Sequence, residues 1–301
     1  MVRGWWTVRF SLCVDPSRPW SETRELARVV DEAGWYAVYL CDHFMPHADD
    51  GRPARGPVVE CWTTLSALAP VTSSVRLGSL VLGTTYRHPA VVASMAATLD
   101  RISDGRVVLG LGAGWQPNEH AAYGIPLPPP AERIAALDEA CAVVRSLLDE
   151  QTTTFAGTTY TLVDAPCDPS PVQRRLPLLV GGGGEQRTMR VAARWADVWH
   201  TWAEPEEFAR KTAVLDERCA EIGRDSRDIA RANGGSICLT ASPRGDRDVE
   251  GVSAEVVERL AAYRAAGVDE FVVRDHGTDP VDEVRAQLDE LTTDVLPALA
   301  T

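Results

Sequence analysis

The sequence predicts a single α/β barrel built from eight parallel strands. Short apolar runs alternate with longer segments of helical periodicity along the whole chain, as expected for parallel strands joined by helical crossovers. The apolar runs number eight, whereas a doubly wound sheet usually has fewer strands. The chain has 301 residues, a length that such barrels reach as one domain.

The first half of the chain contains four of the predicted strands, which are apolar segments bounded by turn residues. They lie at 9–14, 37–41, 75–82 and 106–111, with helices predicted at 21–33, 61–69 and 89–102. Ser21 is expected to cap the first helix and Gly34 to end it. Pro89 suits the first turn of the third helix because that position needs no amide hydrogen.

The second half repeats the alternation after the most periodic helix, Ala131–Glu150. Residues 152–162 are rich in β-formers around Gly157 and predict a short hairpin inserted before strand five. Strands are predicted at 176–180, 197–200, 235–240 and 270–274, with helices at 186–195, 206–222, 256–266 and 281–296. No linker interrupts this pattern, so residues 1–301 are assigned to one (β/α)8 barrel domain.

Net charge, cysteine content and the absence of long apolar runs indicate which kinds of partner to expect. The net charge of −13 disfavours nucleic acid, because phosphate binding needs a basic surface. The 7 cysteines are widely spaced without a C-x-x-C pair, which is typical of a reducing cytosol rather than of a disulfide framework. No signal-like start and no run of 18 apolar residues is present, so a cytoplasmic protein without a membrane partner is expected.

The segments that follow the strands of such a barrel form its functional face. The 6 histidines all follow predicted strands, and none is expected inside a helix: His43, His47, His88, His120, His200 and His276. One such histidine is more often structural than functional, but their shared placement indicates at least one functional imidazole. Trp115, Trp199 and Trp202 follow strands four and six. They suit either a flat conjugated ligand or a hydrophobic plug in the barrel mouth.

Two glycine-rich segments follow strands. Gly181–Gly184 leads from strand five toward a helix, where backbone amides can bind phosphate and Arg187 could add charge. The alternative is a tight turn with positive φ. The segment 110–115 fails the dinucleotide pattern G-x-G-x-x-G because Trp115 replaces the third glycine. It indicates instead that backbone packs closely beneath a ligand.

Asp42 and His43 place a carboxylate beside an imidazole directly after strand two. This pair suits proton transfer near neutral pH. A metal site would need more converging ligands than the sequence brings together, so none is assigned.

Four motifs, in order along the chain, resemble the luciferase-like flavin and deazaflavin oxidoreductases. They are Asp42-His43-Phe44-Met45-Pro46, the pair Arg76-Leu77-Gly78 and Tyr86-Arg87-His88-Pro89, the run from Leu99 to Glu119, and the run from Leu178 to Asp197. The resemblance covers nearly the whole chain, and the ordered set is specific. It is strongest to the branch that uses the deazaflavin coenzyme F420.

The resemblance implies a TIM-barrel fold with a flavin-like ring bound at its mouth. It assigns Asp42 to ring contact and His43 to acid/base catalysis. It also implies a bulge in strand three with a non-prolyl cis peptide near Leu80-Val81, between Gly78 and Leu82. The residues that it assigns to cofactor binding are Asp42, Leu80, Val81, Gly83, Ala113, Gly114, Asn118, Gly182, Gly183, Gly184 and Arg187.

The sequence departs from the sugar-phosphate dehydrogenases of this family at two positions. Trp115 stands where they carry an acidic glutamate after strand four, and His47 stands where they carry a tryptophan after the Asp-His pair. Sugar-phosphate oxidation is therefore not expected. A different substrate pocket is predicted from His47, Trp115, Trp199 and His200.

The leading functional hypothesis is an F420-dependent oxidoreductase that transfers a hydride between the deazaflavin and a small organic substrate. The alternative is an FMN-dependent monooxygenase that uses reduced flavin and oxygen. Two further hypotheses stay open: a metal-dependent hydrolase, which would need His43, His200, His276 and a carboxylate to converge, and an F420 carrier without turnover. Related barrels are often dimers, so a homodimer is expected, although no interface stripe is evident.

Overall fold

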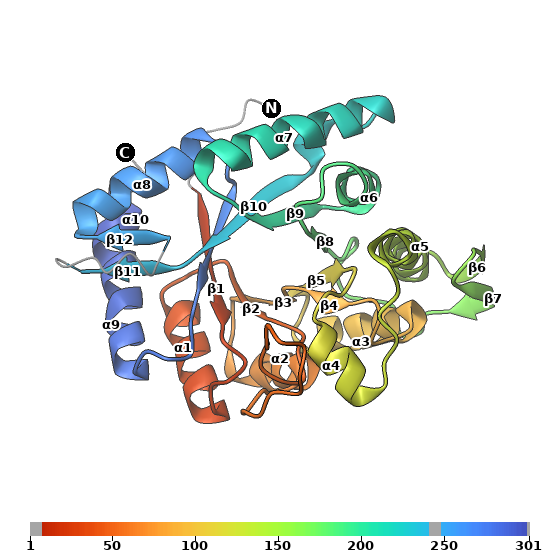
Figure 1. Ribbon diagram of the computed structural model, residues 1–301, viewed down its shortest axis with the longest axis horizontal. Coiled ribbons are helices and arrows are strands. Elements are labelled where there is room, and N and C mark those ends of the chain that lie inside the picture. The colour runs from red at the N-terminus through yellow and green to blue at the C-terminus, as the bar shows by residue number, and fades with distance from the viewer. Residues whose placement is uncertain (1–7, 241–247, 300–301) are drawn as a thin grey trace.

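The computed structural model describes residues 8–240 and 248–299. Eight parallel strands close into a barrel surrounded by helices (Figure 1). The strands are β1 (Arg9–Val14), β2 (Ala37–Leu40), β3 (Arg76–Ser79) continued by β4 (Leu82–Gly83), β5 (Val107–Gly112), β8 (Leu178–Gly181), β9 (Val198–Trp202), β10 (Ala230–Gly235) and β13 (Glu270–Arg274). Neighbours follow chain order, and the pairing of β3 with β5 completes the ring. The predicted fold class is confirmed.

Helices follow the strands and cover the outside of the barrel (Figure 1). They are α1 (Trp20–Glu32), α2 (Cys61–Leu68), α3 (Pro89–Ile102), α4 (Pro117–Tyr123), α5 (Pro130–Asp149), α6 (Thr188–Trp195), α7 (Pro205–Glu221), α8 (Ser253–Ala265), α9 (Val281–Glu290) and α10 (Leu296–Leu299). Short 3-10 turns occupy Ala69–Val71 and Ser226–Asp228, and a π-helical turn, Leu291–Val295, joins α9 to α10. The predicted hairpin is present as the antiparallel pair β6 (Thr152–Ala156) and β7 (Thr161–Pro166).

The period-2 alternation of each strand separates an outer face from a lumen face. Outward residues pack against the helices in the main hydrophobic core. The lumen holds a second, smaller cluster of buried side chains: Cys13, Ala37, Tyr39, Leu80, Val108, Leu179, Val198, Ala232 and Val272. Because side chains fill the lumen, a ligand at this barrel would bind beyond the strand ends rather than inside it.

Strand three is interrupted between β3 and β4. The Leu80-Val81 peptide bond is cis, as the resemblance implied. A Cβ atom added to Gly110, Gly112 or Gly181 would lie 2.9, 2.4 or 2.9 Å from a methyl carbon of Val81. Glycine on the two neighbouring strands therefore makes room for the interrupted strand.

The predicted position of strand seven, 235–240, is wrong. The barrel strand is β10, and the apolar run that suggested a strand is β11 (Ile237–Leu239), which pairs outside the barrel with β12 (Val249–Gly251). Sequence patterning missed β10 because its lumen-facing residues are small. A Cβ on Gly234 would lie 2.0 Å from Cζ3 of Trp202 on β9, so the barrel needs a glycine where a strand would ordinarily show an apolar side chain.

Three helix predictions need correction. The first helix begins at Trp20 with Pro19 in the N-cap position, so Ser21 is not its cap. Helix α6 begins at Thr188 rather than at residue 186, and a turn therefore separates it from the glycine run. Helix α4 was not predicted, and it places His120 inside a helix.

None of the helices in the two described ranges combines the length and apolar character needed to cross a bilayer. All seven cysteines are free thiols. Within residues 8–240 and 248–299, no group of three His, Cys, Asp or Glu side chains is placed to hold a metal ion.

Candidate active site

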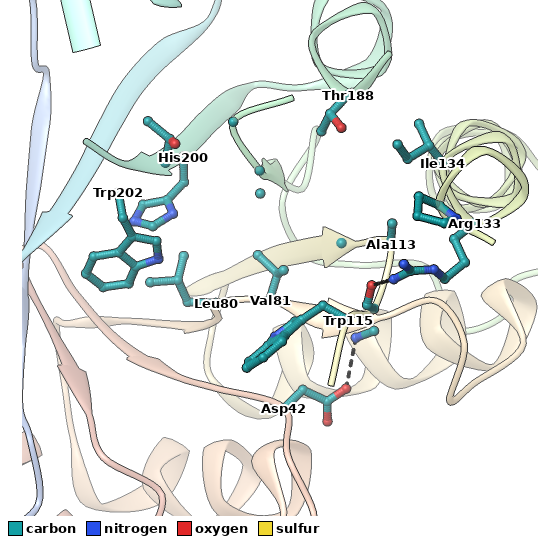
Figure 2. Close-up of a pocket in the computed structure, with 18 of the residues that line it drawn as sticks. Asp42, Leu80, Val81, Ala113, Trp115, Arg133, Ile134, Thr188, His200 and Trp202 are labelled. Carbon is teal, nitrogen blue, oxygen red and sulfur yellow. Dashed lines mark hydrogen bonds between the residues drawn. The ribbon is translucent and has the colours of Figure 1, made fainter. Parts of the chain in front are cut away.

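A cavity of about 590 Å³ opens beyond the carboxyl ends of the barrel strands (Figure 2). This volume lies within the range of small-molecule and cofactor sites. The barrel strands and the interruption of strand three contribute Leu80, Val81, Gly83, Gly112, Gly181, His200, Thr201 and Trp202. Loops and helices contribute Asp42, His43, Tyr86, Ala113, Gly114, Trp115, Pro130, Arg133, Ile134, Gly182, Gly183, Thr188 and Lys211.

Asp42 is held rigidly at one side of this cavity. Its carboxylate accepts two hydrogen bonds from Arg87, at 2.8 and 3.0 Å, and one from the Gly83 amide at 3.0 Å. Burial raises the pKa of Asp42, and the bonds from Arg87 oppose that rise. Arg87 also contacts Glu60 at 2.5 Å, so a chain of charges fixes the orientation of Asp42.

His43 is oriented by a buried carboxylate that sequence reasoning did not single out. Its Nδ1 lies 2.8 Å from Oε1 of Glu119. The other Glu119 oxygen accepts the Phe44 amide at 2.7 Å, and Tyr86 Oη donates to Oε1 at 2.5 Å. With Nδ1 engaged, Nε2 is the His43 nitrogen available to the cavity.

The pair shifts the pKa of each partner in the opposite direction. Burial by itself lowers the pKa of His43, but the hydrogen bond that His43 donates to Glu119, together with the charges of Cys41, Glu119 and Asp42, raises it above its usual value. Burial would raise the pKa of Glu119, and its bonds to His43, Phe44 and Tyr86 lower it overall. The Glu119 carboxylate therefore favours the protonated form of His43.

The middle of the cavity has a flat floor and an aromatic wall. Leu80 and Val81 form the floor, and the ring of Trp115 lies above Asp42 (Figure 2). Trp115 packs edge-on against His43, with centroids 5.5 Å apart, and against His47 at 4.9 Å. This arrangement suits a flat ligand that contacts the backbone on one face.

His200 and Trp202 project from β9 into the inner end of the cavity (Figure 2). His200 is buried, and its Nε2 has no hydrogen-bond partner among residues 8–240 and 248–299. Burial lowers the pKa of His200 to about 3, so this imidazole is neutral at pH 7. A neutral imidazole can donate or accept one hydrogen bond with a ligand oxygen.

Another part of the cavity carries two basic side chains, of which Lys211 also lies 3.3 Å from Glu207 and 3.8 Å from Glu185. Lys211, on α7, donates from Nζ to the Gly183 carbonyl at 2.7 Å, and Arg133, on α5, donates to the Gly114 carbonyl. Thr188 and the backbone of Gly182 lie in the same part of the cavity. Two cations, a hydroxyl and exposed backbone form a suitable environment for a phosphate group.

The structure brings most of the predicted site residues to the cavity lining: Asp42, His43, Leu80, Val81, Gly83, Ala113, Gly114, Trp115, Gly182, Gly183 and His200. Five predicted residues lie outside the lining: His47, Asn118, Gly184, Arg187 and Trp199. Gly184 and Arg187 are exposed in the turn before α6. His47 reaches the site only through its contact with Trp115.

Trp199 and Asn118 face away from the cavity for local structural reasons. Trp199 alternates with His200 on β9, so it points outward, where it stacks on Phe208 at 5.5 Å and donates to the Gly182 carbonyl. Asn118 is buried in α4 and donates to the Pro46 carbonyl at 2.9 Å. The prediction that Trp199 contacts substrate is therefore wrong, and Trp199 instead stabilises the glycine turn through its bond to Gly182.

The remaining histidines serve structural roles or lie elsewhere. His88 caps α3 by accepting the Ala90 amide at 3.2 Å. His120 bonds the Gln116 carbonyl at 2.7 Å and Thr85 at 2.8 Å. His276 lies beside β13, away from this cavity. Only His43 and His200 among the histidines line the cavity.

Several lining residues were not predicted as site residues: Tyr86, Arg133, Ile134, Thr188, Thr201 and Lys211. Tyr86 lies in a family motif that was not read as a site, Thr201 lies on β9, and the other four lie on helices. Lys211 nevertheless carried a signal. It is the only lysine in a chain with 30 lysine and arginine residues, and it is buried. A compact ammonium in a chain that otherwise uses arginine indicates a position with a specific requirement.

The fold and the cavity define a barrel with a cofactor-sized site at its strand ends. The chain belongs to the luciferase-like monooxygenase family, whose model matches residues 3–249. The family predicted from the sequence motifs is therefore confirmed, and with it the class of oxidoreductase.

Among curated proteins, the chain is 34% identical over 213 residues to an F420-dependent glucose-6-phosphate dehydrogenase of Microbacterium testaceum. The match covers 69% of this chain and 61% of that relative, so the chain spans about three fifths of its length.

Among solved structures, an F420-dependent secondary alcohol dehydrogenase in complex with an F420-acetone adduct superposes with a TM-score of 0.84 at 19% identity, over 97% of this chain and 99% of that one. A long-chain alkane monooxygenase gives a TM-score of 0.81 at 16% identity, over 97% and 91%. These likenesses show the fold, which oxidoreductases of different kinds share.

Proposed function

We propose that this protein is a coenzyme F420-dependent oxidoreductase that transfers a hydride between the deazaflavin ring and a small organic substrate. The observation that carries the proposal is the 34% identity to a relative named as an F420-dependent dehydrogenase, over a chain whose cavity suits such a cofactor. Bound F420 would supply a ring carbon that gives or accepts a hydride.

The residues of the cavity fit this cofactor at both ends. The floor at Leu80 and Val81 would support the flat ring, since Gly112 on the adjoining strand leaves no side chain above it. Lys211 and Thr188 would hold the phosphate beside Gly183. The cofactor would then span the cavity from the strand ends at Leu80 and Val81 to the start of α6.

His43 would hold and deliver the proton that accompanies hydride transfer, at Nε2. Its position is set by Glu119 at 2.8 Å, and the raised pKa keeps the imidazole protonated to a higher pH than usual. Asp42, fixed by Arg87, would contact the polar edge of the ring. Orientation of this kind accounts for much of the rate enhancement in reactions between bound groups.

The substrate is proposed to be other than a sugar phosphate. Trp115 occupies the wall where the resembling sugar-phosphate dehydrogenases carry an acid, and it is 53% exposed toward the opening. An indole offers apolar contact and no proton. The pocket between Trp115 and Trp202 therefore suits a substrate with an apolar body.

The proposal is tested by titrating the purified protein with F420 and, separately, with FMN, in oxidised and reduced forms. F420 is expected to bind and His43→Ala to retain that binding while losing turnover. Tight FMN binding without F420 binding, with oxygen consumption when a flavin reductase is supplied, would establish the monooxygenase instead. F420 binding with no turnover across a broad substrate panel would indicate a carrier.

A further inference from the structure

Arg274 stands at the barrel mouth on the lumen face of β13. Glu270 and Val272 face the lumen, where Glu270 accepts a 2.6 Å hydrogen bond from Ser11 and Val272 joins the inner cluster. Residues two apart on a strand share a face, so Arg274 follows them at the top of the lumen. Its register partner on β1 is Cys13.

The guanidinium of Arg274 has no carboxylate partner within the described parts of the chain. The adjacent Asp275 is already satisfied, because Arg18 donates two hydrogen bonds to it at 2.5 and 2.7 Å. Glu204, which follows β9, pairs with Arg259. Arg274 is exposed, and a solvent-facing guanidinium at the mouth is available to an anion.

Trp202 connects Arg274 to the cavity. The Arg274 guanidinium carbon lies 5.8 Å from the centroid of the Trp202 ring, and Trp202 lines the cavity with 45% of its surface exposed. Gly234 lies directly beneath the indole, since a Cβ there would overlap the ring. The indole thus lies between the Arg274 guanidinium and the cavity.

Beside the Trp202 ring lies Nε2 of His200, a polar atom that a ligand could bind. His200 contacts Trp202 edge-on, with centroids 5.0 Å apart, and is 3% exposed. Its Nε2 is buried and finds no hydrogen-bond partner in the part of the chain that the structure describes. A buried polar atom without a partner costs free energy unless a ligand or water satisfies it.

We propose that Arg274, Trp202 and His200 form the substrate site, and that it takes a small organic carboxylate with an apolar body. The carboxylate would pair with the planar guanidinium, the body would lie on Trp202, and a hydroxyl or carbonyl oxygen would bond to His200 Nε2. This proposal rests on the proposed function, because it places the substrate beside the ring that would occupy the floor at Leu80 and Val81.

A carboxylate is favoured over a phosphate by the distribution of charge. Arg133 lies across the cavity from Trp202 (Figure 2). Lys211 is engaged by the Gly183 carbonyl and lies 3.3 Å from Glu207, whereas Arg274 contacts Trp202 directly. One guanidinium matches the charge and the planar fork of a carboxylate, whereas a phosphate dianion usually recruits more donors. The indole beside it adds apolar contact that a sugar phosphate would not use.

The test compares carboxylates with their neutral amides by calorimetry, using phenylacetate, indole-3-acetate and hexanoate and the matching amides. Each is measured with the cofactor-free protein and with saturating F420. Wild type is expected to bind at least one acid about tenfold more tightly than its amide, in line with a charge-assisted pair. Arg274→Gln should abolish that preference, and Arg274→Lys should keep part of it.

Arg28→Gln is the matched control, because Arg28 is an exposed residue of α1 paired with Glu32. It should leave the preference unchanged, and all variants should bind F420 as wild type does. Equal binding of every acid and its amide, an unchanged preference in Arg274→Gln, or stronger binding of glucose 6-phosphate than of any carboxylate would overturn the proposal. If the wild-type protein does not bind F420, the proposed cofactor is refuted. The preference for acids over amides can still be measured with the cofactor-free protein.

Discussion

Nδ1 of His43 lies 2.8 Å from Oε1 of Glu119, a carboxylate that is wholly buried and belongs to a different segment of the chain. The two residues are 76 positions apart. Their contact makes the imidazole of His43 a better base than an isolated one and points its other nitrogen at the cavity.

Glu119→Gln should lower the pKa of His43. The carboxylate raises this pKa above 6.5 against the effect of burial, so its removal leaves burial to dominate. If protonated His43 is the active form, kcat/KM should fall at a lower pH in the variant than in wild type. Glu132→Gln, an exposed change in the first turn of α5, is the control, and an unshifted pH profile in Glu119→Gln would contradict the assignment.

Arg87→Leu should destabilise the protein by about 3 kcal/mol, because it leaves the buried Asp42 carboxylate without its cation. Urea unfolding measures this change. Asp42→Asn in the same background should restore part of the loss, since it removes the uncompensated charge. Arg28→Gln breaks an exposed pair and should cost less than about 1 kcal/mol; an equal cost for both arginines would argue against a structural role for the Arg87–Asp42 pair.

Lys211 should be the amine that responds to cofactor binding. It is the only lysine in the chain and lies in the cavity beside Gly183. F420 should therefore protect its side chain from acetylation, as read by mass spectrometry, and Lys211→Gln should weaken F420 binding about tenfold, as expected for a lost charge-assisted contact. Arg187→Gln, exposed outside the lining, should have a smaller effect, and the reverse order would place the phosphate elsewhere.

Gly234→Ala should displace the Trp202 indole, because the new Cβ would lie 2.0 Å from a ring carbon. Overpacking of this kind costs about 1–3 kcal/mol. The double variant with Trp202→Leu should recover most of the lost stability, since the smaller side chain frees the space. A double-mutant cycle in thermal unfolding measures the coupling, and additive effects would show that the two residues do not compete for this space.

His200 should remain neutral down to about pH 3, the value to which burial lowers its pKa. The unfolded chain takes up this proton near pH 6.5 and the folded protein does not, so stability should decrease as the pH falls below 6.5. His200→Gln removes this dependence, and its unfolding free energy should decline less over the same range. NMR titration of the labelled imidazole in wild type checks the premise, and a His200 signal titrating near pH 6 would contradict it.

The alternation of apolar runs and helical segments was sufficient to predict the barrel and the face that carries the site. It worked where burial requires apolar residues, as in Arg9–Val14 and Glu270–Arg274, whose bounds match β1 and β13. It failed at β10, where Gly234 must be small to accommodate Trp202. Where a side chain from a neighbouring strand occupies the lumen, the strand beside it needs a small residue and therefore shows no apolar pattern in the sequence.

Some residues of the candidate site could likewise be predicted from the sequence, and others could not. Sequence motifs located Asp42, His43 and the glycine run, because residues that follow strands directly are placed by the fold class. The partners that tune them came only from the tertiary structure. Glu119 lies on an unpredicted helix, Arg87 contacts Asp42 across a loop, and Lys211 reaches Gly183 from α7.

The sequence by itself determined the barrel and the family, since both depend on local patterns or ordered motifs, and it predicted the position of Asp42 and His43 after strand two. Tertiary structure alone decided which way each side chain points: Trp199 outward and His200 inward from adjacent positions on β9. It also decided that Arg274 lacks a carboxylate partner in the described chain while Asp275 is paired with Arg18. The physical reason is that charge and hydrogen bonding act through space, so their balance depends on neighbours that are distant in the chain.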